Sequence, residues 1–332
     1  MARGGWRALF YSLLSGAEFR RVRQEGGRRP DAENCCYIGK TWYSEASLGH
    51  ISGFRGEVEM KDAICEVIRR FVQEKSGNRF QGSEERYFDE PLIGFASAED
   101  PLFASYKSII GQFHLTPLEL AQWGNADSWR PRTVVCWVLP VSEATRRSNH
   151  NETTYPSRAW AETRQHGEAF NASLRRQLVQ FLCDSGHNAL APQLHPAWSE
   201  YSESPAGLAS SWSERHAAYA AGLGTFSLND ALITPLGIAH RLGSVITDVP
   251  VEPSSRPYAD HKANCLWHRN GTCGACIARC PVGALSIDGH DKQICRDHVY
   301  GTIPGAVGEA YNVTSTGCGL CQTKIPCESR IP

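Results

Sequence analysis

The stretch "CGACIARCPVGAL", residues 273–285, decides the character of the C-terminal part of this 332-residue chain. It carries the last three cysteines and the proline of the bacterial ferredoxin run C-x2-C-x2-C-x3-C-P, whose thiolates ligate iron–sulfur clusters. Asn270 stands where the first cysteine belongs, and a carboxamide is a poor iron ligand. The nearest upstream thiol is Cys265, so the sequence predicts that the loop "LWHRNGT" bulges to bring Cys265 beside Cys273.

Four further cysteines complete a set of eight in this part of the chain. In two-cluster ferredoxins the fourth cysteine of the run ligates the other cluster, so the ligand order is crossed and the clusters lie close together. This order predicts two [4Fe–4S] clusters that conduct electrons. The first quartet is Cys265, Cys273, Cys276 and Cys327, and the second quartet is Cys280, Cys295, Cys318 and Cys321.

Two other interpretations of the eight cysteines remain. C-x2-C pairs also occur in structural zinc sites, and clusters could serve only to brace the C-terminal segment. The number of cysteines, the Cys-Pro step and the apolar "VGALSI" that follows it favour iron–sulfur clusters. One dense cysteine module in a long chain is typical of metal binding in a reducing compartment, so the prediction is a cytoplasmic protein.

The charge composition limits the kinds of partner that the protein could attract through its overall charge. The 34 basic and 35 acidic residues leave a formal charge of -1, which provides no global field toward a polyanion or an acidic membrane, although it does not exclude nucleic-acid binding. No apolar run reaches the length of a membrane span. Residues 1–40 form an arginine-rich N-terminal extension that matches neither a secretory nor a twin-arginine signal. A transit peptide and an ordinary helical or extended leader both remain as interpretations.

Periodicity predicts alternating helices and strands between residues 41 and 252. Apolar residues at three- and four-residue steps predict helices over 56–75 and 168–186. Continuous apolar, β-branched runs predict strands over 132–141 and 237–251. This alternation favours a two- or three-layer α/β domain that binds cofactor and substrate.

A further helix is predicted just after Ser211. Ser211 and Glu214 have the S-x-x-E spacing of a capping box, Gly222 is placed to end the helix, and Gly224 keeps the next turn free of side-chain bulk. The proline- and serine-rich "VPVEPSSRPYAD" then joins this α/β domain to a cluster-binding domain over 258–332.

These residues also carry a resemblance. "SERHAAYAAGLGTFSLNDALITPLGIAHRLGSVITD" (213–248) followed by the cysteine module, together with "PLIGFASAEDPLF" (91–103), resembles the superfamily of epoxyqueuosine reductase and the reductive dehalogenases. The likeness extends from about Glu85 to Cys327. It implies a nitroreductase-like or corrinoid-processing-like α/β domain followed by a two-cluster ferredoxin-like α+β module.

The resemblance also implies an activity. Proteins of this superfamily bind cobalamin between the two domains, receive electrons from a low-potential donor such as a ferredoxin or flavodoxin, and use the reduced corrinoid to attack or reduce the substrate. Related α/β folds hold flavin, which is the alternative cofactor. The family's Asp-Tyr-His stretch is absent, since this chain reads "TTYPSRAWAETRQHGEAFN" there, and "AGLGTFSLN" replaces "AGLGWIGKN". A divergent branch with an unidentified small or nucleoside-like substrate is therefore expected.

Candidate catalytic residues follow from these departures. Tyr155 and Arg158 occupy the stretch that replaces the family's acid and are candidate proton donors, although a surface-loop role explains them equally well. His216 is a candidate for the wall of the cofactor or substrate cavity, the alternative being an ordinary helix histidine.

Candidate cofactor-binding residues lie beside His216. Gly222 and Gly224 could let a large ring approach the backbone, and Glu214 lies near them, although helix-end and capping roles also explain all three. The alternative function is an electron-transfer protein that reduces a partner, for example a corrinoid protein. A large enclosed cavity beside the inner cluster, lined by the loops around Tyr155 and His216, would favour the enzyme.

Overall fold

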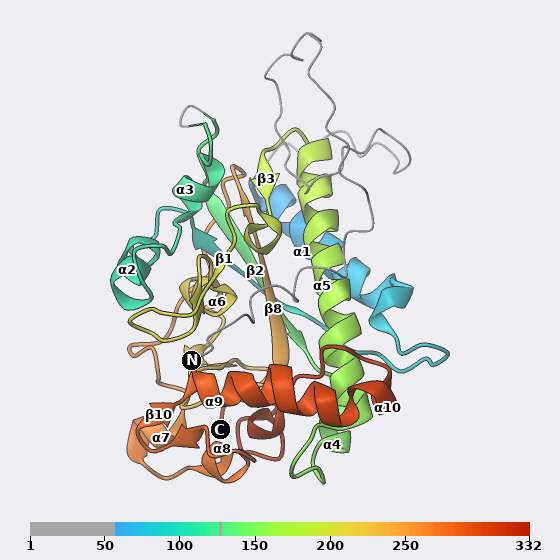
Figure 1. Cartoon of the computed structure of the whole chain (residues 1–332). Helices are drawn as coiled ribbons and strands as arrows, with labels where there is room; N and C mark the ends of the chain where they lie inside the picture. Colours follow the sequence, from blue (N-terminus) through green and yellow to red (C-terminus); the bar gives the residue numbers. More distant parts are fainter. Residues whose placement is uncertain (1–56, 126–127) are drawn as a thin grey trace, which may run out of the picture. The chain divides into compact units, whose positions relative to one another are not determined.

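The structure is a computed structural model that describes residues 57–125 and 128–332 (Figure 1). The predicted extension over 1–40 lies outside the described residues. A four-stranded sheet forms the centre, in the order β1-β2-β8-β3, and every neighbouring pair of strands is antiparallel. Its strands are β1 (Leu92–Ser97), β2 (Thr133–Pro140), β3 (Ala189–Leu190) and β8 (His240–Thr247).

The central strand β2 is buried along its whole length. Its residues alternate between two cores: Val135 and Trp137 pack on one face of the sheet, whereas Val134 and Val138 pack on the other. A strand covered on both faces needs apolar residues at every position, which explains its continuous apolar sequence. The predicted strand over 132–141 is confirmed, and the one predicted over 237–251 is the shorter β8.

Two long helices cover the first face of the sheet. Helix α1 (Glu57–Glu74) confirms the helix predicted over 56–75, and its Ile64 and Ile68 pack against Leu178 of α5 in one core. Helix α5 (Arg158–Asp184) begins ten residues earlier than predicted. The reason is a local cap, because the hydroxyl of Ser157 accepts the backbone N–H of Trp160 at 3.2 Å.

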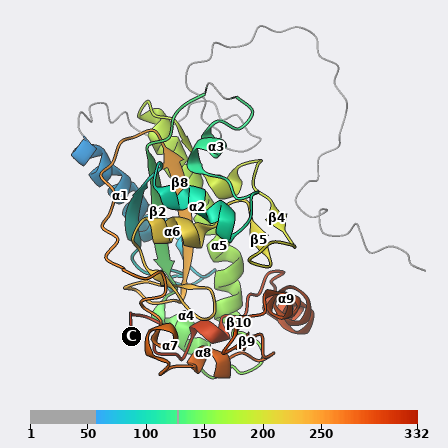
Figure 2. The ribbon, with the colours of Figure 1, turned by 90° about the vertical axis from the view of Figure 1, so that its left-hand side faces the viewer.

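Helices α2 (Pro101–Ile109) and α6 (Glu214–Ala220) cover the second face, as Figure 2 shows from their side. Phe103 of α2 stacks on Trp212 just before α6, with ring centroids 5.7 Å apart. The mixed α/β expectation is thus confirmed in a three-layer form.

The predicted capping box of α6 is wrong. The N-cap residue is Ser213, and it makes no side-chain cap. The Ser211 hydroxyl instead donates to the carbonyl of Ala197 at 3.0 Å and accepts from the N–H of Ser199 at 2.9 Å. Because the Ser211 hydroxyl bonds the turn at residues 197–199, it does not cap α6, and Glu214 is available for other partners.

Short elements complete the chain. Three two-residue strand pairs are antiparallel: β4 (Glu200–Tyr201) with β5 (Ala209–Ser210), β6 (Thr225–Phe226) with β7 (Leu232–Ile233), and β9 (Leu285–Ser286) with β10 (Gly289–His290). The short helices are α3 (Pro117–Ala121), α4 (Glu143–Ser148), α7 (Leu266–Asn270), α8 (Ala275–Ala278), α9 (Lys292–Asp297) and α10 (Glu309–Tyr311). Two π-helical stretches, His298–Thr302 and Pro304–Gly308, connect α9 to α10, and the 3-10 turns are Ser76–Asn78, Pro192–Leu194 and Leu320–Gln322.

The cysteine-rich segment is tied to the α/β part by hydrogen bonds. The N–H of Ile238 donates to the carbonyl of Cys327 at 2.9 Å, and Arg279 donates to the carbonyl of Asn149 at 3.0 Å. The proposed domain limits, 41–252 and 258–332, stay predictions. No helix within 57–125 or 128–332 combines the length and apolarity that crossing a bilayer requires.

Candidate metal and cofactor site

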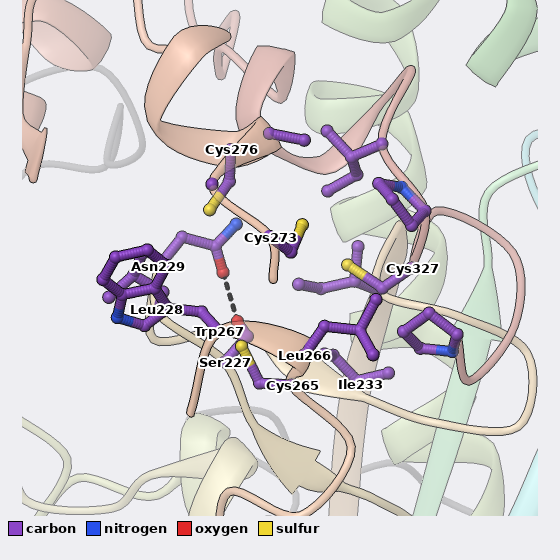
Figure 3. A pocket seen from close by; sticks show the side chains of 16 residues that line it. Ser227, Leu228, Asn229, Ile233, Cys265, Leu266, Trp267, Cys273, Cys276 and Cys327 are labelled. Atoms are coloured by element: carbon purple, nitrogen blue, oxygen red, sulfur yellow. Dashed lines mark hydrogen bonds between the residues drawn. The ribbon is translucent and has the colours of Figure 1, made fainter. Parts of the chain in front are cut away.

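The four cysteines of the first quartet surround one small pocket. Figure 3 shows the Sγ atoms of Cys265, Cys273, Cys276 and Cys327 directed toward the same space. The rest of the wall is mainly apolar and includes Leu228, Ile233, Ile238, Trp267, Ala275 and Ile325. The predicted members of this quartet are therefore neighbours, while their role as iron ligands stays a prediction.

Cys265 reaches this pocket through a single helical turn. Residues Leu266–Asn270 form α7, and Gly271 ends it in the left-handed conformation at a φ of 72°. The N–H of Gly271 donates to the carbonyl of Trp267 at 2.9 Å, which closes the turn. The inserted "LWHRNGT" thus folds compactly and returns the chain to Cys273.

Burial shapes the acidity of the first quartet. It raises the pKa of Cys276 to about 11 and that of Cys327 to about 12, and the neighbouring thiols of the quartet raise both pKa values further. Such a group is held as thiolates only when a cationic centre balances the charge. The donor set therefore fits a metal centre that binds thiolate sulfur, as iron does in iron–sulfur clusters.

The second quartet is also gathered in one place. Burial raises the pKa of Cys321 well above its usual range, and Cys318, Cys295 and Cys280 add to that effect. Cys276 of the first quartet contributes as well, so the two quartets adjoin. Among the residues that the structure describes, no three His, Cys, Asp or Glu side chains converge closely enough to hold one metal ion.

Gly319 fixes the loop between Cys318 and Cys321 against α5. It has a φ of 68°, and a methyl group at this position would overlap the indole ring of the buried Trp160. Both the backbone conformation and the close approach of the ring require glycine here.

Replacing Gly319 by alanine is expected to lower the free energy of unfolding by at least about 2 kcal/mol, from backbone strain plus overpacking. Gly283→Ala is the matched control, since Gly283 has a φ of 64° and open space around it. This control isolates the backbone term of roughly 1 kcal/mol. Denaturant titration of both variants measures the difference, and equal losses would contradict a role for the Trp160 contact.

A cavity of about 550 Å³ lies beside the second quartet. All four cysteines of that quartet line it, together with residues of α5, α6, β8 and α9. Its volume is in the range of sites for small molecules. The charged and titratable side chains in its wall are Arg164, Glu168, Glu214, Arg215, Asp230, His240, Arg241, His290, Lys292, Arg296 and His298.

Glu214 belongs to a buried ionic network at the edge of this cavity. The Arg175 guanidinium, 1% exposed, donates to Glu214 at 3.2 Å and to Glu168 at 3.0 Å, and the Ser244 hydroxyl donates to Glu214 at 2.6 Å. Burial raises the pKa of Glu214, although Arg175 opposes the change. One guanidinium thus serves two carboxyl groups.

The structure does not bring the three predicted catalytic residues to the cavity. His216 is buried away from it, with its ring 4.7 Å from that of Tyr106. Tyr155 stacks on His298, which does line the cavity, so Tyr155 lies behind the wall. Arg158 opens α5 and donates to the carbonyl of Ala310. The expected lining around Tyr155 and His216 is therefore replaced by other residues.

The two predicted glycines have close backbone neighbours of their own. A methyl group on Gly222 would overlap the carbonyl of Ser255, and one on Gly224 would overlap that of Ile233. Neither glycine lines the cavity, so chain packing accounts for both.

Sequence reasoning missed the polar stripe of α5. Arg164, Glu168, Asn171 and Arg175 recur at three- and four-residue steps and so lie on one helix face. Asn171 and Arg175 are fully buried, whereas Arg164 and Glu168 line the cavity. A stripe of charged residues on a helix resembles a face exposed to solvent. In this stripe, however, the charges have opposite signs and the side chains are long, and both features are signals of a buried ionic network.

Known proteins are similar to parts of this chain. No protein-family model matches the chain. An epoxyqueuosine reductase of Bacillus anthracis is 34% identical over 119 residues, a match that covers 34% of this chain and 29% of that relative's length.

Two kinds of solved structure are also similar. An epoxyqueuosine reductase with a tRNA-Tyr epoxyqueuosine-modified tRNA stem loop is 19% identical, with a TM-score of 0.47, and the match covers 82% of this chain and 66% of that chain. A reductive dehalogenase, whose structure suggests a mechanism for B12-dependent dehalogenation, is 18% identical with a TM-score of 0.42, over 69% and 28% of the two chains. The sequence match thus shows that about a third of the chain is similar to an epoxyqueuosine reductase, and it spans less than a third of that relative's length.

Proposed function

We propose that this chain is an iron–sulfur oxidoreductase of the epoxyqueuosine reductase type, in which two [4Fe–4S] clusters supply electrons to a cofactor in the 550 Å³ cavity. The sequence match to epoxyqueuosine reductase supports a reductase acting on a small or nucleoside-like substrate. The observation that carries the proposal is the position of the second quartet, since all four of its cysteines line the cavity.

The arrangement supports one order of electron flow. The first quartet lines its own small pocket, the second quartet lines the large cavity, and the two quartets adjoin. Electrons from a low-potential ferredoxin or flavodoxin would enter at the first cluster and leave from the second. A pure carrier protein would need no cavity of this size beside its inner cluster, which favours the enzyme over the electron-transfer alternative.

The cavity has room for the ring of a corrinoid or of a flavin. A corrinoid is proposed, because the resemblance implies it, and when bound it supplies a low-potential cobalt centre that reduces or displaces a group on the substrate. Leu232, Ile238 and Leu242 supply apolar wall for a ring, while Gln193 supplies an amide at the edge.

Glu214 is proposed as the proton donor in place of the family's missing aspartate. Glu214 lines the cavity, and burial raises its pKa, which is the direction that a proton donor requires. Tyr155 and Arg158 are not proposed for this role, because neither lines the cavity. Arg175 holds the carboxyl in place from behind and is a positioning residue.

Iron analysis tests the clusters. Protein purified without oxygen is expected to contain about eight irons and eight sulfides per chain. Cys276→Ser and Cys318→Ser, one from each quartet, are each expected to reduce the iron content to about four. Cys65→Ser is the control, since this free thiol lies on α1. Zinc in place of iron, or an equal loss in the control, would contradict the proposal.

Absorbance titration with cobalamin then tests the cofactor. A shifted corrinoid spectrum with iron-loaded protein supports the reductase. Full iron content without any corrinoid binding would leave the electron carrier, or a flavin enzyme if flavin mononucleotide binds instead.

A further inference from the structure

Arg and Lys side chains outnumber Asp and Glu side chains in the wall of the large cavity, which the four cysteines of the second quartet also line. Its wall contains five basic and three acidic side chains, the histidines not counted. The basic ones are Arg164, Arg215, Arg241, Lys292 and Arg296, and the acidic ones are Glu168, Glu214 and Asp230. In a partly desolvated cavity, a cation is favourable only where an anion or a hydrogen-bond acceptor lies against it, so the partners of each cation must be considered separately.

Three of the five cations are satisfied by the protein itself. Arg215 donates to the carbonyl of Asp230 at 2.7 Å, and Lys292 lies 3.9 Å from the carboxylate of the same residue. Arg296 lies 3.5 Å from Glu200, outside the cavity wall. These three side chains therefore have partners before any ligand binds.

Arg164 has no such partner. Within 57–125 and 128–332, its guanidinium has no hydrogen bond or ion pair, although the side chain is half-buried and packs against Gly317. Gly317 directly precedes Cys318 of the second quartet. A half-buried guanidinium with five donors and no acceptor is expected to have an external one.

Arg241 faces the same cavity and is only weakly balanced. Its Nε lies 3.8 Å from Glu168, whereas that carboxylate accepts a closer bond of 3.0 Å from Arg175. The pKa of Arg241 is lowered to about 9, mainly by burial and secondly by the positive charge of Arg164. The two guanidiniums thus repel each other.

We propose that Arg164 and Arg241 together bind an oxyanion, a phosphate or a carboxylate, on the molecule that occupies the cavity. Planar guanidinium groups bind such anions through paired hydrogen bonds. This inference rests on the proposed function for the identity of the occupant. The anion belongs either to the substrate or to the cofactor, as the phosphate of a corrinoid nucleotide loop or of flavin mononucleotide.

Calorimetric titration of the purified iron-loaded protein with inorganic phosphate, and separately with acetate, tests the arginine pair. Arg164→Gln and Arg241→Gln are each expected to weaken binding of one of these anions by at least about tenfold. Arg176→Gln is the matched control, because Arg176 lies on the exposed face of the same helix, and it is expected to bind as the unchanged protein does. Absence of anion binding, or equal binding by Arg164→Gln and the unchanged protein, would overturn the proposal.

Paired ligands identify the source of the anion. If it belongs to the cofactor, Arg164→Gln weakens binding of cobalamin or flavin mononucleotide about tenfold but leaves cobinamide and riboflavin, which lack the phosphate, unchanged. If it belongs to the substrate, the variant binds all four as the unchanged protein does. Iron content measured on the same samples separates the two proposals, since protein without iron would refute the oxidoreductase, whereas absence of anion binding by protein with full iron content would refute the arginine pair alone.

Discussion

Arg175→Met is expected to lower the free energy of unfolding by about 3 to 5 kcal/mol, the cost of leaving a buried charge without its partner. The guanidinium is 1% exposed and contacts Glu168, Glu214, the side chain of Gln193 and the carbonyl of Leu242. Methionine would fill much of the space but would satisfy none of these acceptors. Denaturant midpoints, with the m-value unchanged, measure the loss.

A neighbouring residue supplies the control for this substitution. Arg176→Met, on the exposed face of the same helix, is expected to change stability by less than about 0.5 kcal/mol. Adding Glu214→Gln to Arg175→Met is expected to recover part of the loss, because it removes one stranded carboxyl. A loss of similar size in both single variants would show that the ionic network does not stabilise α5.

Acidification is expected to destabilise the protein strongly, because it protonates buried histidines. The pKa of His114 is lowered to about 4, mainly by burial and secondly by the charge of Lys107. The pKa of His216 is lowered to about 3, mainly by burial and secondly by the charge of Arg215. Since both groups stay neutral in the folded protein but titrate near 6.5 when unfolded, stability is complete above pH 6.5. It falls as the pH drops toward 4, by about 2 kcal/mol for each histidine at pH 5.

His114→Phe tests this dependence. Both ring nitrogens of His114 are buried without a hydrogen-bond partner among the described residues, and the ring stacks near Trp212, so phenylalanine should fit the site. The variant is expected to lose about 2 kcal/mol less than the unchanged protein between pH 7 and pH 5. His261→Phe is the control, because His261 is 61% exposed. Parallel stability curves for the unchanged protein and His114→Phe would refute the role of this histidine.

Local sequence patterns predicted the elements whose apolar residues follow the period of a buried strand or of a helix. The continuous apolar run of β2 and the regular apolar face of α1 required no knowledge of their partners. The antiparallel pairing of β2 with β8 joins residues 100 or more positions apart, which periodicity does not specify. Ser211 shows the same limit, since its spacing to Glu214 fits a cap but its hydroxyl bonds Ala197.

The candidate site was likewise predictable from the sequence only in part. The ferredoxin-like order grouped the cysteines into two sets, and the structure places the members of each set together. The cavity wall was not predictable, because it combines α5, α6 and β8 with the cysteine-rich segment. Arg164 and Arg241 are 77 positions apart in the sequence, and only the folded chain makes them neighbours of one cavity.

The two proposed ligand sets are nested in the order of synthesis. Cys265, Cys273 and Cys276 emerge from the ribosome first, the whole second quartet follows, and only then does Cys327 appear. The segment between Cys276 and Cys327 therefore contains every member of the second quartet. The first quartet is complete only when this segment has folded back and returned Cys327 to Cys276, so closing the first ligand set also encloses the second within one loop of the chain.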